Sequence, residues 1–518
     1  MSKLITMNVD GQELQVEEGK NLIDALSAVG IHIPHFCYHP ALGFDGNCRM
    51  CLVEVEGARG PQIACNTPVK EGMKVSLSSE SSMNLRRKVL EFELINHPLD
   101  CPICDQAGEC KLQDYYMEAG LSKSRMEVEK VAKEKNLDFG CGVVHDQERC
   151  VLCARCVRFL RKYTKTAELG IVNRCDKAKV TTFPEKPINN RYALNVVDIC
   201  PVGAMTSRDF RFKQRVWFMS SEKSVCHGCA KGCSIYVDHN QEKYKAERVY
   251  RFRPRENAQV NGHFMCDAGR LSYRKENENR LTTAKASERF EAVDIATSQA
   301  VALLSAAKGK AVFIVSPSWT TEQMAVAKSL ATHYDGYLSG YADGYIVKGD
   351  GDDLLLKEDK AANRASLELL GISTDRQKLI SNLKTAEVVV VLNNDLSLTA
   401  SDKREFEALF AGKQVIFVGS HRIALADSAQ TVIPCASYTE YAGVVVNVDS
   451  ILQEVTCAIE KECFARRPEQ VMAALSGNAI KAELGAVRQQ LSASVPALAQ
   501  VDWNAIPENG LNLKGGAQ

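Results

Sequence analysis

Cysteine accounts for 20 of the 518 residues, and most of these cysteines fall into four closely spaced groups before residue 267. Each group offers four soft ligands, with a histidine joining three cysteines in the second. The groups are Cys37, Cys48, Cys51 and Cys65; His97, Cys101, Cys104 and Cys110; Cys150, Cys153, Cys156 and Cys200; and Cys226, Cys229, Cys233 and Cys266. Such sets are the ligands of iron–sulfur clusters. Because several clusters in one chain serve mainly to pass electrons along a line, we expect an electron-transfer protein.

The composition argues against several other classes of protein. Disulfide-rich secreted proteins are small, whereas C-x2-C units in a long chain are typical of metal or cluster ligation in a reducing compartment. The first residues lack the apolar core of a signal peptide, and the longest apolar runs, such as 386–392, are too short to cross a bilayer. Lys plus Arg and Asp plus Glu number 64 each, so no net charge attracts nucleic acid. We expect a multidomain chain without a nucleic-acid partner and without direct membrane insertion.

The first group has the spacing C-x10-C-x2-C-x13-C. A hairpin is predicted over 4–16, then an amphipathic helix over 22–29 and further short strands near 53–55 and 75–77. The loop 43–47 contains two glycines, which permit backbone amides to approach sulfur. This order predicts a β-grasp domain over 1–80 that holds a [2Fe–2S] cluster. The alternative, structural zinc, usually draws on two compact pairs of ligands.

The second group places His97 ahead of three cysteines, at the end of a helix predicted over 83–95. Pro98 biases His97 away from helical geometry, so His97 begins a loop. A lone histidine here is more often an incidental polar residue, but three cysteines leave a [4Fe–4S] cluster one ligand short. The spacing alone leaves both interpretations open. We expect a [4Fe–4S] module over 81–140, with a charged helical connector over 111–140.

The third group, Cys150-x2-Cys153-x2-Cys156, is the run found in bacterial ferredoxins, and Cys200-Pro201 supplies the distant fourth ligand. Three cysteines at this spacing suit a [4Fe–4S] cluster better than a tetrahedral zinc ion. We expect a ferredoxin-like domain over 141–216. Basic residues surround the run: Arg149, Arg155, Arg158, Arg161 and Lys162. They either offset the negative charge of the cluster or solvate a helix face, and the sequence favours neither.

The fourth group, C-x2-C-x3-C-x32-C, is less diagnostic, so zinc stays an alternative to a third [4Fe–4S] cluster over 217–275. Five cysteines belong to no group. They are Cys141, Cys175, Cys435, Cys457 and Cys463. Since free cysteine behaves as a small apolar residue, we expect each of them to be buried, with no assigned role.

From 276 to 518 the pattern changes to that of an α/β domain. Short β-branched runs at 311–315, 388–392 and 415–418 alternate with helical stretches such as 322–334, which predicts a largely parallel sheet. A long helix is predicted over 479–498 and a frayed tail at 515–518. The fold class as a whole is α/β and α+β multidomain.

Taken in this order, the motifs resemble those of the large iron–sulfur subunit of respiratory complex I, the 75 kDa or G subunit of NADH:quinone oxidoreductase. The stretch 97–110, HPLDCPICDQAGEC, matches that family closely, as does CPVGA at 200–204. The resemblance is specific over residues 1 to about 280 and loose beyond. It implies that His97 is a cluster ligand.

The resemblance also implies a function. Electrons would pass from a flavin subunit that oxidises NADH, across the first three clusters, to the iron–sulfur subunit that leads to quinone. The fourth cluster would lie off this path. The chain would then belong to a large hetero-oligomer, in its peripheral arm at the cytoplasmic face of the inner membrane. No glycine loop for a nucleotide phosphate occurs in the sequence, so we expect no catalytic residue and no substrate site on this chain.

The C-terminal region resembles a shortened molybdopterin oxidoreductase. The stretch 440–453 is similar to the signature E-x2-G-T-x2-N-x-E-G-R-x-Q of those enzymes. Glu440, Gly443, Asn447 and Gln453 fit it, and Val444, Asp449, Ser450 and Ile451 depart from it. Active members carry Lys or Arg where this chain has Ala268, and they need a metal-binding residue in a stretch where this chain has no cysteine. We therefore expect a scaffold without molybdopterin.

Other hypotheses stay open at this level. The same N-terminal motifs occur in electron-relay subunits of NAD(P)-linked hydrogenases and formate dehydrogenases. A catalytic molybdopterin enzyme and a zinc-bearing structural protein are the alternatives from other classes. The sequence decides neither the choice between NADH and NADPH nor the type of quinone.

Overall fold

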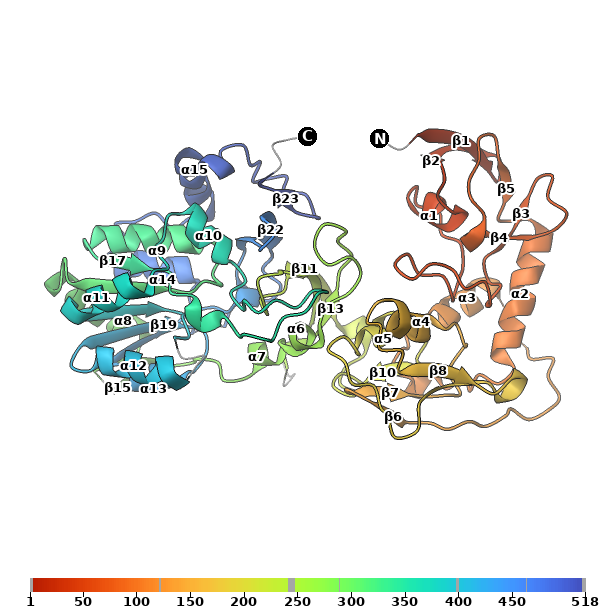
Figure 1. The fold of residues 1–518 in the computed structure, drawn as a ribbon, viewed down its shortest axis with the longest axis horizontal. Helices are drawn as coiled ribbons and strands as arrows, with labels where there is room; N and C mark the ends of the chain where they lie inside the picture. Colours follow the sequence, from red (N-terminus) through yellow and green to blue (C-terminus); the bar gives the residue numbers. More distant parts are fainter. Residues whose placement is uncertain are drawn as a thin grey trace. The chain divides into compact units, whose positions relative to one another are not determined.

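The computed structural model describes residues 3–120, 123–240, 247–287, 289–396, 400–462 and 464–514. The chain forms two compact units, Met1–Phe218 and Met219–Gln518 (Figure 1). Cys463 and the tail predicted at 515–518 lie outside the described residues.

The first unit begins with a small mixed sheet in the strand order β2-β1-β5-β3-β4. Its strands are β1 (Leu4–Val9), β2 (Gln12–Glu17), β3 (Leu52–Val55), β4 (Gln62–Ile63) and β5 (Lys74–Ser76). The predicted hairpin is present, since β1 and β2 pair antiparallel around a turn at Asp10 and Gly11, both with positive φ. Helix α1 (Leu22–Ser27) begins at the Asn21 cap and packs its apolar side on the sheet. The strand β5 lies parallel to β1, which closes the sheet around one core.

The rest of the first unit consists of short elements joined by long loops. The helices are α2 (Glu80–Leu94), α3 (Lys111–Ala119), α4 (Arg155–Lys162) and α5 (Asn195–Asp198). The strands β6 (Leu137–Gly140), β7 (Val143–His145) and β10 (Met205–Ser207) form one antiparallel sheet, and β8 (Leu169–Val172) pairs with β9 (Lys179–Thr182). In Figure 1, α2 runs beside β3, and α3 lies nearby.

The prediction of a helical connector over 111–140 is wrong beyond α3. The helix ends where Gly120 adopts a left-handed conformation, and residues 123–136 contain no helix. Instead this segment is held to the end of α2 by specific bonds. The Lys130 ammonium donates to the carbonyls of Leu94 and Ile95 at 2.8 and 3.1 Å, and Val131 N donates to the side chain of Asn96 at 2.9 Å.

The second unit opens with an antiparallel sheet of β11 (Ser220–Val225), β12 (Ser234–His239) and β13 (Val249–Pro254), followed by α6 (Asp267–Leu271) and α7 (Arg274–Asn277). A seven-stranded sheet then forms in the order β15-β14-β20-β19-β18-β16-β17. Five adjacent strands, which reach the edge strand β17, are parallel, as the sequence predicts: β16 (Ala311–Val315), β17 (Tyr337–Ser339), β18 (Val388–Leu392), β19 (Gln414–Gly419) and β20 (Thr431–Pro434). The hairpin of β14 (Ala284–Ala286) and β15 (Arg289–Glu291) closes one edge.

Both faces of this sheet are covered by helices (Figure 1). Alternate residues of one strand face opposite cores: Phe313 and Val315 pack on one side, Val312 and Ile314 on the other. Helices α8 (Val293–Ala306), α9 (Thr321–His333), α10 (Arg364–Leu369), α14 (Pro468–Leu475) and α15 (Leu484–Ser494) contribute to the first core, and α11 (Arg376–Thr385), α12 (Ala400–Phe410) and α13 (Ala424–Ser428) to the second.

The long helix predicted over 479–498 is shorter in the structure. It spans only α15 and is followed by a separate 3-10 turn, Pro496–Leu498. The residue before Pro496, Val495, is extended, with φ −117° and ψ 105°, because a proline disfavours helical geometry in its predecessor.

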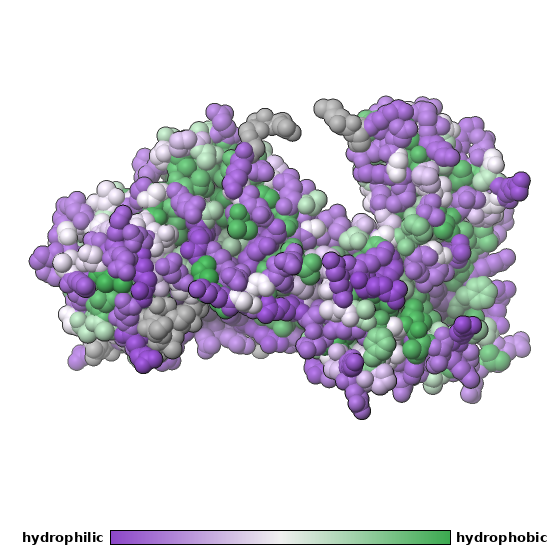
Figure 2. All heavy atoms as spheres, viewed as in Figure 1, coloured by the Kyte–Doolittle hydropathy of each residue, from purple (hydrophilic) through white to green (hydrophobic). Residues whose placement is uncertain are grey.

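A last small sheet follows the order β21-β22-β23, with β21 (Gly443–Val446), β22 (Ile451–Val455) and β23 (Leu511–Asn512). Over the visible face of the molecule the surface is largely hydrophilic, with apolar side chains scattered among polar ones (Figure 2). No helix among the described residues is both long and apolar enough to cross a membrane.

Candidate iron–sulfur centres

The four cysteines of the first group are buried together beside the N-terminal sheet. The sulfurs of Cys37 and Cys48 lie 3.4 Å apart. Hydrogen bonding between thiols lowers the pKa of Cys37 and of Cys51 and raises that of Cys48 and of Cys65. The four sulfurs therefore form one set with close pairs, which fits two irons that each take two thiolates.

The loop of the first group depends on its glycines. Gly43 and Gly46 have φ values of 74° and 76°, a conformation that other residues rarely adopt. These turns bring Cys37 and Cys48 together, and the amide of Cys37 donates to the Cys48 sulfur at 3.4 Å. Amide donors of this kind stabilise thiolate ligands.

The second group lies on the loop between α2 and α3. Cys101 begins the 3-10 turn Cys101–Ile103, and Cys110 is the residue that precedes α3. Burial lowers the pKa of His97 to about 4, so its imidazole is neutral at neutral pH. The neutral ring is the form that ligates metals. Burial also raises the pKa of Cys110 to about 11.

The third group surrounds a small cavity that is also lined by His145, Arg155 and apolar side chains such as Val180, Val202 and Met205. Three of its cysteines precede or begin α4, and Cys200 follows α5. Burial raises the pKa of Cys153 to about 12. Because iron binds thiolates, cluster assembly here must release protons from these buried thiols.

Two arginines near the third group, Arg155 and Arg158, bind the loop of the first group rather than face solvent. The guanidinium of Arg155 donates to the carbonyl of Ile199, which precedes the candidate ligand Cys200 of the third group, at 3.0 Å. The same guanidinium donates to the carbonyl of Tyr38, which follows a candidate ligand of the first group. A single half-buried cation thus joins the loops of two groups.

A second arginine of α4 reinforces this junction. Arg158 donates to the carbonyls of Cys37 and of Gly43, the latter at 2.8 Å. Lys162 donates to the carbonyl of Leu42 at 3.0 Å. From the other side, the side-chain amide Nδ2 of Asn47 donates to the carbonyl of Leu152 at 2.9 Å. Of the two sequence interpretations, a solvated helix face therefore applies to Arg161, which is exposed, and not to Arg155 or Arg158.

A backbone hydrogen bond and a salt bridge join the loops of the second and third groups. The amide of Lys111, which follows the ligand Cys110, donates to the carbonyl of Pro201 at 2.9 Å. Arg149, which precedes the third group, pairs with Asp100 in the second group at 2.5 Å. Cysteines from all three groups also share one hydrophobic core: Cys37, Cys48, Cys110 and Cys153, with Cys150 and Cys200 packed against it. The three candidate sites are therefore neighbours within one unit.

The fourth group lies in the second unit. Cys226 follows β11, Cys233 precedes β12, and Cys266 caps α6. Two backbone amides point at its sulfurs: Gly228 N donates to Cys226 Sγ at 3.4 Å, and Gly269 N donates to Cys266 Sγ at 3.3 Å. Burial raises the pKa of Cys266 to about 11. The first group shares both features, since its cysteines are buried and a backbone amide donates to one of its sulfurs.

A cavity of about 710 Å³ adjoins the fourth group. Residues that follow the carboxyl ends of parallel strands line it, among them Ser316, Asn393 and Ser420. Open α/β sheets bind ligands at this edge. Among the described residues, the ring nitrogen Nε1 of Trp319 and the hydroxyl of Tyr438, which also line the cavity, have no hydrogen-bond partner.

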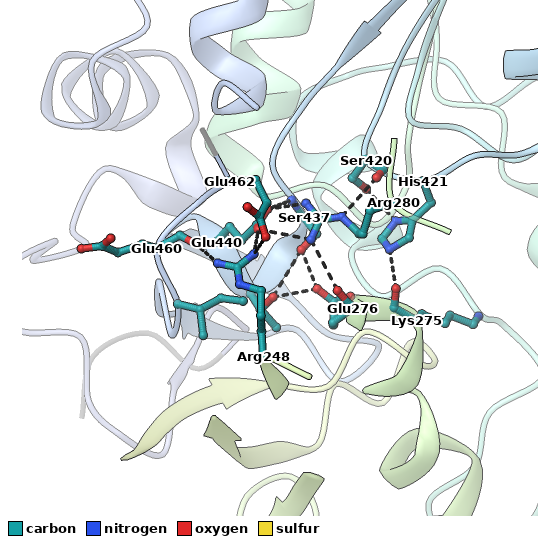
Figure 3. Close-up of polar contacts among 12 residues, drawn as sticks. Arg248, Lys275, Glu276, Arg280, Ser420, His421, Ser437, Glu440, Glu460 and Glu462 are labelled. Carbon is teal, nitrogen blue, oxygen red and sulfur yellow. Dashed lines mark hydrogen bonds and ion pairs between the residues drawn. The ribbon is translucent and has the colours of Figure 1, made fainter. Parts of the chain in front are cut away.

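A buried polar network lies next to this cavity (Figure 3). Its centre is Glu440, which is fully buried and accepts bonds from Arg280 at 2.6 Å and from Arg248 at 2.8 Å. Although burial acts to raise the pKa of Glu440, the bond from Arg280 keeps it below its usual value. Glu276 accepts from the hydroxyl of Ser437 at 2.5 Å. The signature residue Glu440 therefore has a structural role, since it joins three segments through buried ion pairs.

Four domain families match the chain, and together they cover most of its first 278 residues. They are a 2Fe-2S iron-sulfur cluster binding domain at residues 2–80, the NADH-ubiquinone oxidoreductase-G iron-sulfur binding region at 86–125, the ferredoxin-like domain of NADH-quinone oxidoreductase subunit 3 at 140–206, and the molybdopterin oxidoreductase Fe4S4 domain at 219–278.

Relatives match over the same region. The G subunit of the NADH-quinone oxidoreductase of Streptomyces coelicolor is 40% identical over 283 residues, which are 54% of this chain and 33% of the relative. The NADH-ubiquinone oxidoreductase 75 kDa subunit of Reclinomonas americana is 39% identical over 279 residues, which are 54% of this chain and 39% of the relative. The N-terminal half of the chain is similar to these G and 75 kDa subunits. The match thus spans about a third to two fifths of these relatives.

Among the solved structures that match is a chain from a crystal structure of an NAD⁺-reducing [NiFe]-hydrogenase in the H2-reduced state. It is 26% identical, covers 41% of this chain and 91% of its own length, and has a TM-score of 0.36. That score is too low to support a comparison of the folds.

The resemblance to the G and 75 kDa subunits expected from the motifs is therefore confirmed, and both 2Fe–2S and 4Fe–4S domains are identified. No comparison assigns individual ligands. Among the described residues, no group of three or more His, Cys, Asp or Glu side chains is gathered closely enough to hold a metal ion. An iron–sulfur core, which is larger than a single ion, spaces its ligands further apart.

The sequence was less informative about the remaining cysteines. Cys435 is buried, as expected. The expectation of burial is wrong for Cys141, Cys175 and Cys457, which are exposed. Cys141 and Cys175 both lie in tight turns with positive φ, at 48° and 55°, and these turns place them at the surface.

Proposed function

We propose that this chain is an electron-transfer subunit of NADH:quinone oxidoreductase. Its clusters would relay electrons from a flavin subunit that oxidises NADH toward the iron–sulfur subunit that leads to quinone. Both neighbours would bind it in a large hetero-oligomer, within the peripheral arm at the cytoplasmic face of the inner membrane. The similarity to the G and 75 kDa subunits over the first half of the chain supports this function.

We infer one [2Fe–2S] and three [4Fe–4S] clusters, one for each group in the order of the sequence. His97 would be the fourth ligand of the second cluster. Its neutral imidazole supports this assignment, as does the count of three cysteines on its loop. An imidazole ligand raises the reduction potential of a cluster relative to thiolate ligands alone.

The observation that carries the proposal is the junction between the first three groups. Arg155 bonds the ligand loops of the first and third groups, and Lys111 bonds the loop of the second to that of the third. Electron tunnelling falls steeply with distance, so clusters on directly bonded loops can exchange electrons. Cys37 through Cys200 would therefore carry the current, and the fourth group would stay off this path.

The copurifying subunits decide which complex contains the chain. Affinity purification of the tagged chain under mild detergent should recover a flavin subunit and membrane subunits related to cation antiporters. Recovery of a nickel–iron or formate-oxidising subunit instead would favour the alternative, an electron-relay subunit of an NAD(P)-linked hydrogenase or formate dehydrogenase.

The residues 276–518 would serve as a scaffold, without molybdopterin. Ala268 and the buried ion pairs of Glu440 support this proposal. Since the cavity beside the fourth group leaves room for a ligand, elemental analysis is the deciding test. Stoichiometric molybdenum or tungsten would overturn the scaffold proposal, and zinc in place of iron would overturn the cluster assignment.

A further inference from the structure

Three successive carbonyls of the fourth group's loop are bound by one distant hairpin. The loop is Ala230–Gly232, between the ligands Cys229 and Cys233, and the hairpin joins β21 to β22. The backbone amide of Val448 donates to the carbonyl of Ala230 at 2.9 Å. The other two carbonyls are bound by side chains.

Asn447 and Gln453 supply those two bonds. The Asn447 amide nitrogen Nδ2 donates to the carbonyl of Lys231 at 3.1 Å. The Gln453 amide nitrogen Nε2 donates to the carbonyl of Gly232 at 2.9 Å. Both side chains are almost fully buried, with 1% and 2% of their surface exposed. Because both groups are buried, the loss of either bond would leave a polar group that water cannot reach, which costs free energy.

Each amide is also held at its oxygen. The Asn447 oxygen accepts from the backbone amides of Asp449 at 3.0 Å and Ile451 at 2.9 Å. The Gln453 oxygen accepts from the hydroxyl of Ser234 at 3.1 Å. These bonds fix which end of each amide faces the loop, so the donors are already oriented.

The loop fits closely against these side chains. Gly232 has a φ of 58°, and a β-carbon there would lie 3.2 Å from the Gln453 nitrogen and 3.3 Å from the Asn447 β-carbon. At the rim, Lys231 pairs with Asp449 at 2.7 Å. The loop is therefore set by the hairpin as well as by its own sequence.

We propose that Asn447 and Gln453 are positioning residues for the fourth cluster. By binding the carbonyls of Lys231 and Gly232, they keep these negative dipole ends away from the thiolates of Cys229 and Cys233. This inference rests on the proposal that the fourth group holds a cluster. It gives two residues of the molybdopterin-type signature a task that needs no molybdopterin.

Outer-shell partners of this kind tune metal sites, and their loss typically lowers metal affinity by about 10- to 100-fold. The variants Asn447→Asp and Gln453→Glu test the proposal, because each retains the held oxygen and replaces the donor to the loop with a second, negatively charged oxygen. Asn512→Asp is the matched control: it makes the same change on the exposed strand β23 of the same sheet.

The measurements use the full chain in its complex. Iron content, electron paramagnetic resonance and redox titration should show a fourth-cluster signal with a lower potential in each variant. In the double variant, a chelator should remove this cluster about 10-fold faster or more. The signals of the other clusters, and all signals of the control, should not change. A shift in potential separates positioning from a loss of folding.

Two outcomes would overturn the inference, and they differ. If Cys233→Ala removes about four irons but both amide variants leave the fourth signal and its potential unchanged, the hairpin does not position the cluster. If Cys233→Ala leaves the iron content unchanged, the fourth group holds no cluster, and that part of the proposed function fails with the inference.

Discussion

A side chain at Gly203 would collide with the sulfur of Cys104. A β-carbon built on Gly203 lies 2.3 Å from Cys104 Sγ and 3.1 Å from the β-carbon of Gln106. Gly203 lies three residues after Cys200, the candidate distant ligand of the third group, and Cys104 belongs to the second group. The backbone that follows Cys200 therefore passes directly against Cys104 of the second group.

Gly203→Ala should displace Cys104 and impair the second cluster, because the sulfur has to move or the loop 200–204 has to shift. We expect loss or strong broadening of the second cluster's paramagnetic signal, with the first cluster retained. Gly170→Ala is the control, since a β-carbon there meets nothing within 4 Å. Normal spectra for Gly203→Ala would contradict the packing described.

Arg155→Lys should weaken the junction between the first and third groups, although it keeps the positive charge. A lysine cannot span the carbonyls of Ile199 and Tyr38 together, and losing one charge-assisted bond costs about 1.5–3 kcal/mol. The midpoint temperature of thermal unfolding should fall, and the magnetic dipolar coupling between the two clusters should weaken. Arg161→Lys, on the exposed side of the same helix, should change neither measurement.

His97→Cys should retain a cluster and lower its reduction potential, because a thiolate replaces a neutral imidazole. A redox titration followed by electron paramagnetic resonance measures this shift. His97→Ala should lose the cluster or leave it labile to chelators. An unchanged titration in both variants would mean that His97 is not a ligand.

Cys153→Ala should stop electron flow, whereas Cys233→Ala should leave it unchanged. Each should remove about four irons, but only the first should stop NADH-driven quinone reduction, since a missing member of the bonded series leaves too wide a gap. Cys175→Ser, which changes an exposed cysteine outside the groups, should leave iron content and activity intact. Equal loss of electron flow in Cys153→Ala and Cys233→Ala would place the fourth cluster on the path.

The sequence predicted the features that depend on local spacing. The β1–β2 hairpin and the parallel strands follow from patterns a few residues long, whereas the assignment of the ligand groups stays a prediction. The helices α9 and α2 begin within a few residues of their predicted starts, because Thr320 and Ser79 cap them. In α2, however, the prediction of a helix did not reveal which apolar side chains face solvent: the ring of Phe92 is exposed, whereas Leu90 is buried.

What the sequence could not predict depends on contacts between distant residues. For Arg155 and Arg158 the sequence left two interpretations open, offsetting the charge of the cluster or solvating a helix face. Their partners in the loop 37–43 lie more than a hundred residues earlier. Gly203 resembled any glycine until its neighbour Cys104 was known. The signature residues Asn447 and Gln453 suggested a lost cofactor, yet they bind the loop of the fourth group.

The bonds from the hairpin to that loop also bear on the order in which the cluster sites mature during synthesis. They join residues 216 and 221 positions apart, from Lys231 to Asn447 and from Gly232 to Gln453. The first three groups are complete within the unit that ends at Phe218. Because domains fold as units during synthesis, this unit can be ready for cluster insertion while the ribosome is still translating the rest. The fourth group obtains its full set of contacts only after residue 453 has emerged, so its maturation should come last.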